Sequence, residues 1–272
     1  MKKLFPTILV LNLLAIGLNA QNSSDKFRFG LRVSAQPSWL RSNDIKKIDP
    51  SGAVFGSGFG LVMDWKINDV ASFSTGIGGD FEGGKQKFVD TTFYVVNKDD
   101  EIIEFPSDTS SYYANSAYML TERKLKTTAI NIPLVLKLST NEIKNFKYFG
   151  QFGLDLGILL KLRSTDQVKT IMDNGVPISY KEEELTDVNP YQGTIPVRLG
   201  LNVGAGAEYR LTGSTSAFAT INYVHQFINT FVADTKYYAE SYSTSGNKLI
   251  FSDRAKQSAF GSAIQINLGI LF

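Results

Sequence analysis

A regular alternation of large apolar residues with small or polar ones recurs eight times and constrains the fold more than any other feature. The final run, SAFGSAIQINLGILF, shows the pattern: from Phe260 to Phe272 every second residue is large and apolar, except Ser262. A period of two is typical of a β-strand with two different faces. The eight runs cover residues 27–39, 55–66, 71–82, 130–138, 148–163, 197–210, 217–226 and 260–272. No amphipathic helical pattern of useful length separates them, so the sequence predicts an all-β chain.

The connections between the runs alternate between short and long. Residues 67–70, 139–145 and 211–214 are rich in Asn, Asp, Gly and Ser, which favour tight turns. The four other connections, residues 41–53, 83–127, 164–196 and 228–257, are much longer. Short turns at one end and long loops at the other predict an eight-stranded antiparallel up-and-down β-barrel.

Alternation alone does not tell which face is outside, because a water-soluble, lipocalin-like barrel and a membrane barrel have opposite polarity but the same period. The interior of an eight-stranded barrel is only wide enough for side chains or one small ligand. One face of these runs is dominated by Phe, Leu, Ile, Tyr and Trp, and the other by Gly, Ser, Ala and Asn. We therefore expect the small and polar face to line the lumen and the bulky apolar face to contact lipid, as in a transmembrane β-barrel.

A barrel in lipid has to close, because each unpaired backbone group there costs several kcal/mol. The run at 260–272 is accordingly predicted to pair with the run at 27–39. The N-terminus, MKKLFPTILVLNLLAIGLNAQ, is typical of a secretory signal peptide. Cleavage is expected after Ala20, which leaves residues 21–272 as the barrel domain, exported to the outer membrane; an N-terminal membrane anchor is the alternative.

Three segments carry a family resemblance. The stretch N131-I-P-L-V-L-K137, the opening FRFGLRVSAQPSW at residues 27–39 and the leader before Gln21 together resemble the PorT-like outer-membrane β-barrel family of the Bacteroidetes. The terminal strand ending in Phe272 is similar to the C-terminal signature that the barrel insertion machinery reads. The resemblance implies an outer-membrane barrel, in a family named after a factor in the secretion of gingipain-type proteases, and it carries over no functional residue.

No catalytic, cofactor-binding or metal-binding residue is predicted. The chain has no cysteine, which excludes disulfides, Cys-ligated metals and a thiol nucleophile, and its net charge of +2 gives no electrostatic reason to expect nucleic-acid binding. The only histidine, His225, is expected on the lipid face beside Tyr223 and Phe227. Outer-membrane lipid A deacylases have a catalytic histidine on such a face with serine two residues later, but here that position is Phe227. The glycine clusters at 56–60, 76–79 and 204–206 do not complete G-x-G-x-x-G.

The lumen-facing side of the alternation carries many charged residues. They are Arg28, Arg32, Lys66, Lys137, Lys161, Arg163, Arg198, Arg210, Asp64, Asp80, Glu82, Asp155 and Glu208. Unpaired burial of these charges would be very costly, so we expect a paired internal network that fills the barrel. A polar pathway for ions or small solutes and an acid–base pair of carboxylates are the alternatives.

The long connections at 83–127 and 164–196 are rich in Asp, Ser, Thr, Tyr and Asn. Residues 92–96 and 101–105 are predicted to form a hairpin above the membrane. Because function on a rigid scaffold tends to reside in loops, we expect a monomeric, non-enzymatic protein that acts in surface interaction or envelope structure, with a protein or glycan partner at these loops. The alternatives are an accessory component of a secretion or envelope-assembly machine, a narrow channel and a lipid-modifying enzyme.

Overall fold

The computed structural model describes residues 26–104, 118–173, 179–190, 193–232, 236–239, 241–242, 249–250 and 254–272. The eight long strands are β1(Phe27–Arg41), β3(Val54–Lys66), β4(Ala71–Val96), β6(Tyr118–Ser139), β7(Phe146–Asp173), β9(Val197–Thr212), β10(Thr215–Gln226) and β14(Phe260–Leu271). The shorter ones are β2(Ile48–Gly52), β5(Ile102–Ile103), β8(Ser179–Val188), β11(Tyr238–Ala239), β12(Ser241–Tyr242) and β13(Leu249–Ile250). The described residues include no helix long and apolar enough to cross a membrane. The signal peptide expected at residues 1–20 lies outside the described residues.

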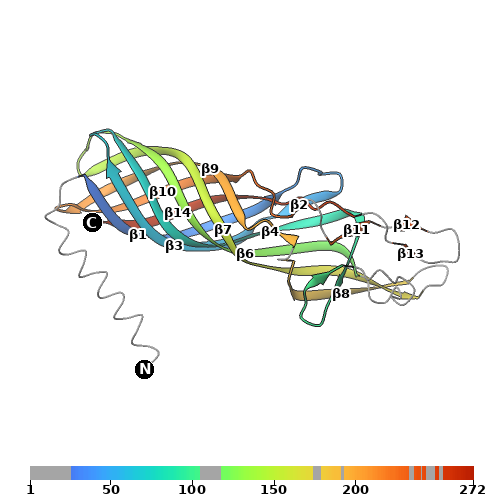
Figure 1. Ribbon diagram of the computed structural model, residues 1–272. Coiled ribbons are helices and arrows are strands. Elements are labelled where there is room, and N and C mark those ends of the chain that lie inside the picture. Colours follow the sequence, from blue (N-terminus) through green and yellow to red (C-terminus); the bar gives the residue numbers. More distant parts are fainter. Residues whose placement is uncertain are drawn as a thin grey trace, which may run out of the picture.

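The eight long strands form a ring of antiparallel neighbours. The pairing order is β4-β3-β1-β14-β10-β9-β7-β6, and β6 pairs back to β4. The closing pair, β1 with β14, runs from Gly30↔Leu271 to Arg41↔Phe260, so the terminal strand joins the first strand as predicted. Figure 1 shows this barrel with the C-terminus at the end that carries the short turns. The predicted all-β, antiparallel up-and-down barrel is confirmed.

The two faces of the barrel strands have the predicted orientation. Leu156, Leu201 and Ile266 are 38%, 39% and 45% exposed on the outer surface, whereas Asn202 and Asn267 are 4% and 2% exposed inside. A belt of large apolar side chains therefore surrounds the barrel, as the hydrocarbon layer requires. The turns also lie where the sequence places them: Asn68 Oδ1, for example, accepts hydrogen bonds from the backbone N–H groups of Val70 and Ala71 between β3 and β4.

Three strands continue far beyond the barrel, which corrects the prediction of loops over 83–127 and 164–196. Residues 84–96 of β4, 118–127 of β6 and 161–173 of β7 form a sheet with β2, β5, β8 and β11. We call this part of the protein the extension; Figure 1 shows it on the side of the barrel opposite the short turns. The alternation continues in the extension, but its outward face carries charged residues such as Lys85, Lys124 and Lys126. This change of polarity is expected, because the outward face of the extension no longer contacts lipid. The predicted hairpin is confirmed by the pairs Val95↔Ile103 and Val96↔Ile102, while Phe105 lies outside the described residues.

A β-bulge in β7 explains one error in the predicted lumen face. Thr128 pairs with Lys161 and Ala129 with Leu159, so Leu160 is an extra residue. An inserted residue reverses the inward and outward faces beyond it. Leu162 is consequently buried, whereas Lys161 and Arg163 lie on the outer face, contrary to the prediction.

Lys66 and Arg210 were also predicted to face the lumen, but both are exposed at the ends of their strands. Lys66 Nζ lies 3.0 Å from Asp69 Oδ1 in the adjoining turn. Arg210 forms an ion pair with Glu142 in the turn between β6 and β7. The alternation gives the face of a residue but not where the lumen ends, so charges at the rim are misassigned.

Candidate functional site

A cluster of four charged side chains occupies the lumen at the short-turn end, and we call it the ionic quartet. It consists of Arg28 from β1, Asp64 from β3, Lys137 from β6 and Glu208 from β9. Arg28 Nη1 donates to Glu208 Oε2 at 2.9 Å, and Lys137 Nζ donates to Asp64 Oδ2 at 2.9 Å. Lys137 also forms an ion pair with Glu208 and lies 4.0 Å from the ring centre of Phe149. Two cations and two anions thus neutralise one another.

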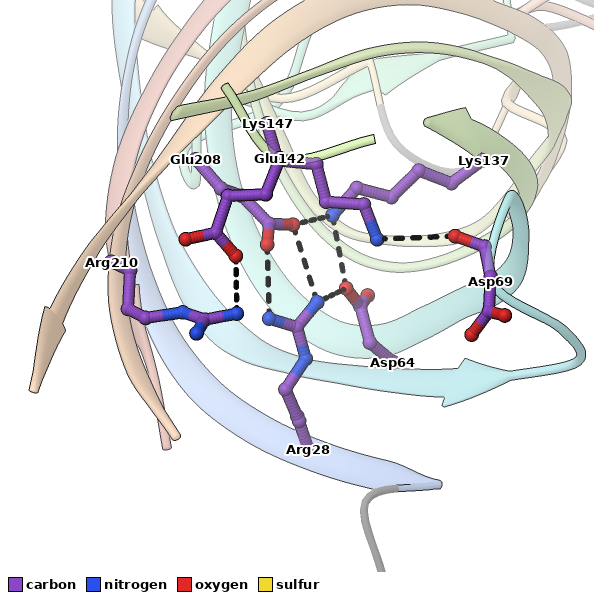
Figure 2. Close-up of polar contacts among 8 residues, drawn as sticks. All are labelled: Arg28, Asp64, Asp69, Lys137, Glu142, Lys147, Glu208 and Arg210. Atoms are coloured by element: carbon purple, nitrogen blue, oxygen red, sulfur yellow. Dashed lines mark hydrogen bonds and ion pairs between the residues drawn. The ribbon is translucent and has the colours of Figure 1, made fainter. Parts of the chain in front are cut away.

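Further polar contacts surround the quartet at the rim, and Figure 2 shows how they approach it. Arg210 and Glu142 pair beside Glu208, and Lys147 Nζ donates to the backbone oxygen of Asp69 at 3.4 Å. The side chains that converge here come from strands far apart in the chain, because the ring brings β1, β3, β6 and β9 around one axis. This end of the lumen is therefore filled with ion pairs.

A second polar layer fills the middle of the lumen. Arg32 Nη1 donates to Asn267 Oδ1 at 3.1 Å, and Asn131 Nδ2 donates to Asp80 Oδ2 at 2.6 Å. Glycine makes room for this layer: a Cβ at Gly58 would lie 2.2 Å from Asp80 Oδ1, and one at Gly78 would lie 2.8 Å from Arg32 Nη2. The abundant strand glycines on the inner face thus have a packing reason at these two positions.

Two small cavities lie between the layers in the part of the chain that the structure describes. One cavity of about 50 Å³ borders Arg32, Asp64, Lys137, Asp155 and Asn202, and another of about 20 Å³ lies near the opposite end of the lumen. Because one water needs roughly 10–15 Å³ of such space, these cavities hold a few waters and no larger solute. No group of three or more His, Cys, Asp or Glu side chains in the described part of the chain is arranged to hold a metal ion.

Apolar side chains close the lumen at the end nearer the extension. Arg198 and Glu82 form an ion pair below this closure. Above that pair lies a buried cluster that we call the apolar seal; it comprises Leu40, Leu125, Leu159, Leu162, Phe231 and Ala259. Phe231 and Ala259 come from the connection between β10 and β14 and pack against the four leucines of the cluster. A hydrogen bond joins the two ends of this connection: Asn229 Oδ1 accepts from the backbone N–H of Ala259 at 2.8 Å.

The extension has a hydrophobic core of its own. It comprises Ile48, Phe88, Tyr94, Ile102, Leu120, Val168, Val188 and Tyr237. These residues come from β2, β4, β5, β6, β7 and β8 and from the connection between β10 and β14. Because the sheet and the last connection share one core, the extension is a packed structure and not a set of independent loops.

A fully buried ion pair lies between this core and the apolar seal. Arg123 on β6 and Asp166 on β7 are both 0% exposed. Arg123 Nε donates to Asp166 Oδ1 at 2.8 Å, and its Nη2 contacts Asp166 Oδ2, so the pair is bidentate. The Tyr94 hydroxyl donates to Asp166 Oδ2 at 2.8 Å, and Arg123 also donates to the Tyr237 hydroxyl.

The electrostatics of this group follow from its burial. Burial raises the pKa of Tyr237 to about 12, and burial beside Asp166 raises the pKa of Tyr94 well above its usual value. The attraction of Asp166 outweighs burial at Arg123, whose pKa is raised further above its already high value. Both tyrosines therefore stay neutral and Arg123 stays charged at any physiological pH.

The structure places His225 as the sequence predicts. Its ring lies on the outer face between the rings of Tyr223 and Phe227, at centroid distances of 5.9 Å and 5.7 Å. Its Nδ1 is 3.0 Å from the Tyr223 hydroxyl.

The sequence singles out none of Arg123, Asp166, Tyr94 and Tyr237, because all four lie in the long connections between the predicted barrel strands. The sequence does contain a signal for them. Arg123 lies two residues before Leu125, and Asp166 lies two residues before Val168, so in a strand each charged residue shares a face with an apolar one.

Comparison with models of known protein families agrees with this architecture. Residues 19–232 match the family model described as outer membrane protein beta-barrel domain. The chain belongs to this family of outer-membrane β-barrel proteins, and the outer membrane is its location. Comparison with curated proteins gives no match.

Solved structures of outer-membrane proteins resemble the fold at low identity. Neisserial surface protein A has a TM-score of 0.38 at 11% identity, over 90% of this chain and 97% of that one. OprG from Pseudomonas aeruginosa has a TM-score of 0.39 at 11% identity, over 93% and 98% of the two chains. Ail from Yersinia pestis has a TM-score of 0.32 at 10% identity, over 91% and 99%.

Proposed function

We propose that this protein is a non-enzymatic outer-membrane scaffold that presents the extension outside the cell for contact with a protein or glycan. One observation supports the proposal most: the extension is built on continuous barrel strands and has its own core around the Arg123–Asp166 pair. A binding surface on such a base loses little conformational freedom when it meets a partner. The same proposal includes export by the N-terminal signal peptide, insertion through the C-terminal strand and a monomeric state.

A filled lumen argues against the channel alternative. Ion pairs occupy the short-turn end, and the apolar seal closes the other end. Either closure would have to open before a solute could pass.

The remaining alternatives have less support. Among the residues that the structure describes, His225 contacts two aromatic rings and no carboxylate, which gives a lipid-modifying reaction no activated base. A role as an accessory of a secretion or envelope-assembly machine is the second candidate, and it rests on the PorT-like residues at 27–39 and 131–137. Such a role would also use the extension or the barrel wall as the contact surface.

Replacement of the extension tests the proposal. In one variant, short turns replace residues 86–123 and 165–194, so that the barrel strands remain; in the matched control, Glu82→Gln perturbs only the lumen. Both are expressed in a strain that lacks the native protein, and heat-modifiable gel migration reports whether each barrel is folded. We expect the first variant to lose the surface phenotype of the native strain and the control to keep it. A folded barrel that retains the phenotype without its extension contradicts the proposal.

A further inference from the structure

Five cations form a strip on the outer face of the sheet, directly where the extension begins. They are Lys85 on β4, Lys124 and Lys126 on β6, and Lys161 and Arg163 on β7, and we call them the basic strip. Lys85 is the direct cross-strand neighbour of Lys124, and Lys126 is that of Arg163. Like charges in directly opposite positions destabilise a sheet unless a counter-charge lies between them.

The strip has little neutralisation from the protein itself. Among the described residues, no ion pair involves Lys85, Lys124, Lys126 or Lys161, and Arg163 Nε lies 3.6 Å from Asp187 Oδ1. Two other acidic residues, Asp49 and Glu122, lie farther from the barrel, where both are cross-strand neighbours of Lys87. On the inner face of the same strands, by contrast, Arg123 is fully paired. The outward cations are therefore available to an external anion.

The position of the strip relative to the apolar belt identifies the kind of anion. Phe81, Ile130 and Ile158 are exposed on the same three strands just below it. Thr128 is paired with Phe81, and Lys126 lies two residues beyond Thr128. At about 3.3 Å per residue, Lys126 is roughly 7 Å along the strand from the level of Phe81. With the exposed side chains of Phe81, Ile130 and Ile158 in the hydrocarbon layer, this distance suits a contact with lipid headgroups.

The strip is also confined to one side of the barrel. On the β1–β3 side, the outward residues near this level are Trp39 and Phe55, which are cross-strand neighbours of Ser262 and Pro37. The cation beyond them, Arg41, already donates to Ser262 Oγ and to the backbone oxygen of Gln226. A ring of interfacial cations around the whole barrel would indicate general contact with the membrane surface. Cations gathered on three neighbouring strands above exposed apolar side chains match instead the shape of a single molecule with an anionic head and acyl chains.

We propose that the basic strip binds the phosphate groups of a phosphorylated glycolipid in the outer leaflet, while its acyl chains lie against the apolar side chains of β4, β6 and β7. Ammonium and guanidinium groups make charge-assisted hydrogen bonds to phosphate, and several cations at one level suit a headgroup with more than one phosphate. The inference rests on the proposed placement of the extension outside the cell, but not on a partner at its tip, since it concerns the barrel wall.

Native mass spectrometry of the full barrel in detergent micelles tests the proposal. The probes are lipid A with two phosphates and the same lipid after enzymatic dephosphorylation. We expect the native protein to retain the phosphorylated lipid preferentially. The variant Lys85→Gln/Lys124→Gln/Lys126→Gln should weaken retention about fivefold per lysine, hence on the order of 100-fold in total. The variant with arginine at the same three positions should retain the lipid.

The matched control removes three lysines elsewhere: Lys98→Gln/Lys144→Gln/Lys181→Gln changes the net charge equally but leaves the strip intact. It should bind the phosphorylated lipid as the native protein does. Equal retention of the two lipid forms, or equal weakening by the test and control variants, overturns the proposal. So does inorganic pyrophosphate that binds as tightly as the lipid, because the site would then recognise free phosphate. Heat-modifiable migration verifies that every variant is a folded barrel.

Discussion

Removal of Arg123 should loosen the extension without opening the barrel. The variant Arg123→Met keeps most of the side-chain volume but leaves Asp166 buried, with the Tyr94 hydroxyl as its only remaining donor among the contacts described above. An uncompensated buried charge of this kind costs about 3–5 kcal/mol. The native side chain also lies 5.4 Å and 5.0 Å from the ring centres of Tyr94 and Tyr237, and these contacts are lost as well. The cost falls on the extension, because none of these groups contributes to the ionic quartet.

Hydrogen exchange followed by mass spectrometry locates this loss. At tenfold per 1.4 kcal/mol, amides in β7 and β4 near Asp166 and Tyr94 should exchange on the order of 100- to 5,000-fold faster, while those in β10 and β14 stay protected. The double variant Arg123→Met/Asp166→Leu should recover most of the protection, since apolar replacement of a whole buried pair is often neutral. Unchanged exchange near Asp166 in the single variant would refute the reasoning. So would a double variant as unprotected as the single one.

Three further outcomes are expected. Because the pKa of Tyr237 is raised to about 12, its contribution to the stability of the extension should be complete below about pH 10 and lost as the pH rises through 12. Near-ultraviolet circular dichroism of the native protein and of Tyr237→Phe measures this loss, and equal pH profiles of the two proteins would contradict it. Gly78→Val should displace Arg32 and reduce the temperature at which the barrel converts to its heat-denatured gel form, whereas Gly213→Asn in the open β9–β10 turn should leave that temperature unchanged. Equal conversion temperatures for the two variants would argue against close packing at Gly78. In planar bilayers the native protein should show no steady conductance, because the quartet and the apolar seal close the lumen, and a reproducible open state in the native protein would contradict that closure.

The barrel could be predicted from the sequence because lipid imposes a strict polarity on every spanning strand. Leu201 and Asn202 show the principle: neighbouring residues have opposite polarity because they have opposite surroundings. Strand pairing followed from closure, since a sheet edge is not tolerated in hydrocarbon. Short-turn positions followed from local residue chemistry.

The extension was not predicted because water imposes no such polarity. Outward residues there, such as Lys124 and Lys126, resemble those of any solvated loop, and only the inward residues mark the strands. The bulge at Leu160 interrupts the alternation at Ile158-Leu159-Leu160, and a strict period of two continued across it places Lys161 and Arg163 on the wrong face. The Arg123–Asp166 pair joins residues 43 positions apart, and its formation depends on the register of β6 and β7 rather than on a motif.

Single-cysteine labelling tests the polarity of the barrel wall most directly, since the chain contains no cysteine of its own. Leu201→Cys and Asn202→Cys are adjacent on β9, and the native side chains are 39% and 4% exposed. With a nitroxide label in lipid nanodiscs, position 201 should show high collision rates with dissolved oxygen, which concentrates in hydrocarbon, and low rates with a water-soluble nickel complex. Position 202 should be poorly labelled or inaccessible to both. Lipid accessibility at 202 together with a shielded or water-accessible 201 would contradict the membrane orientation of the barrel.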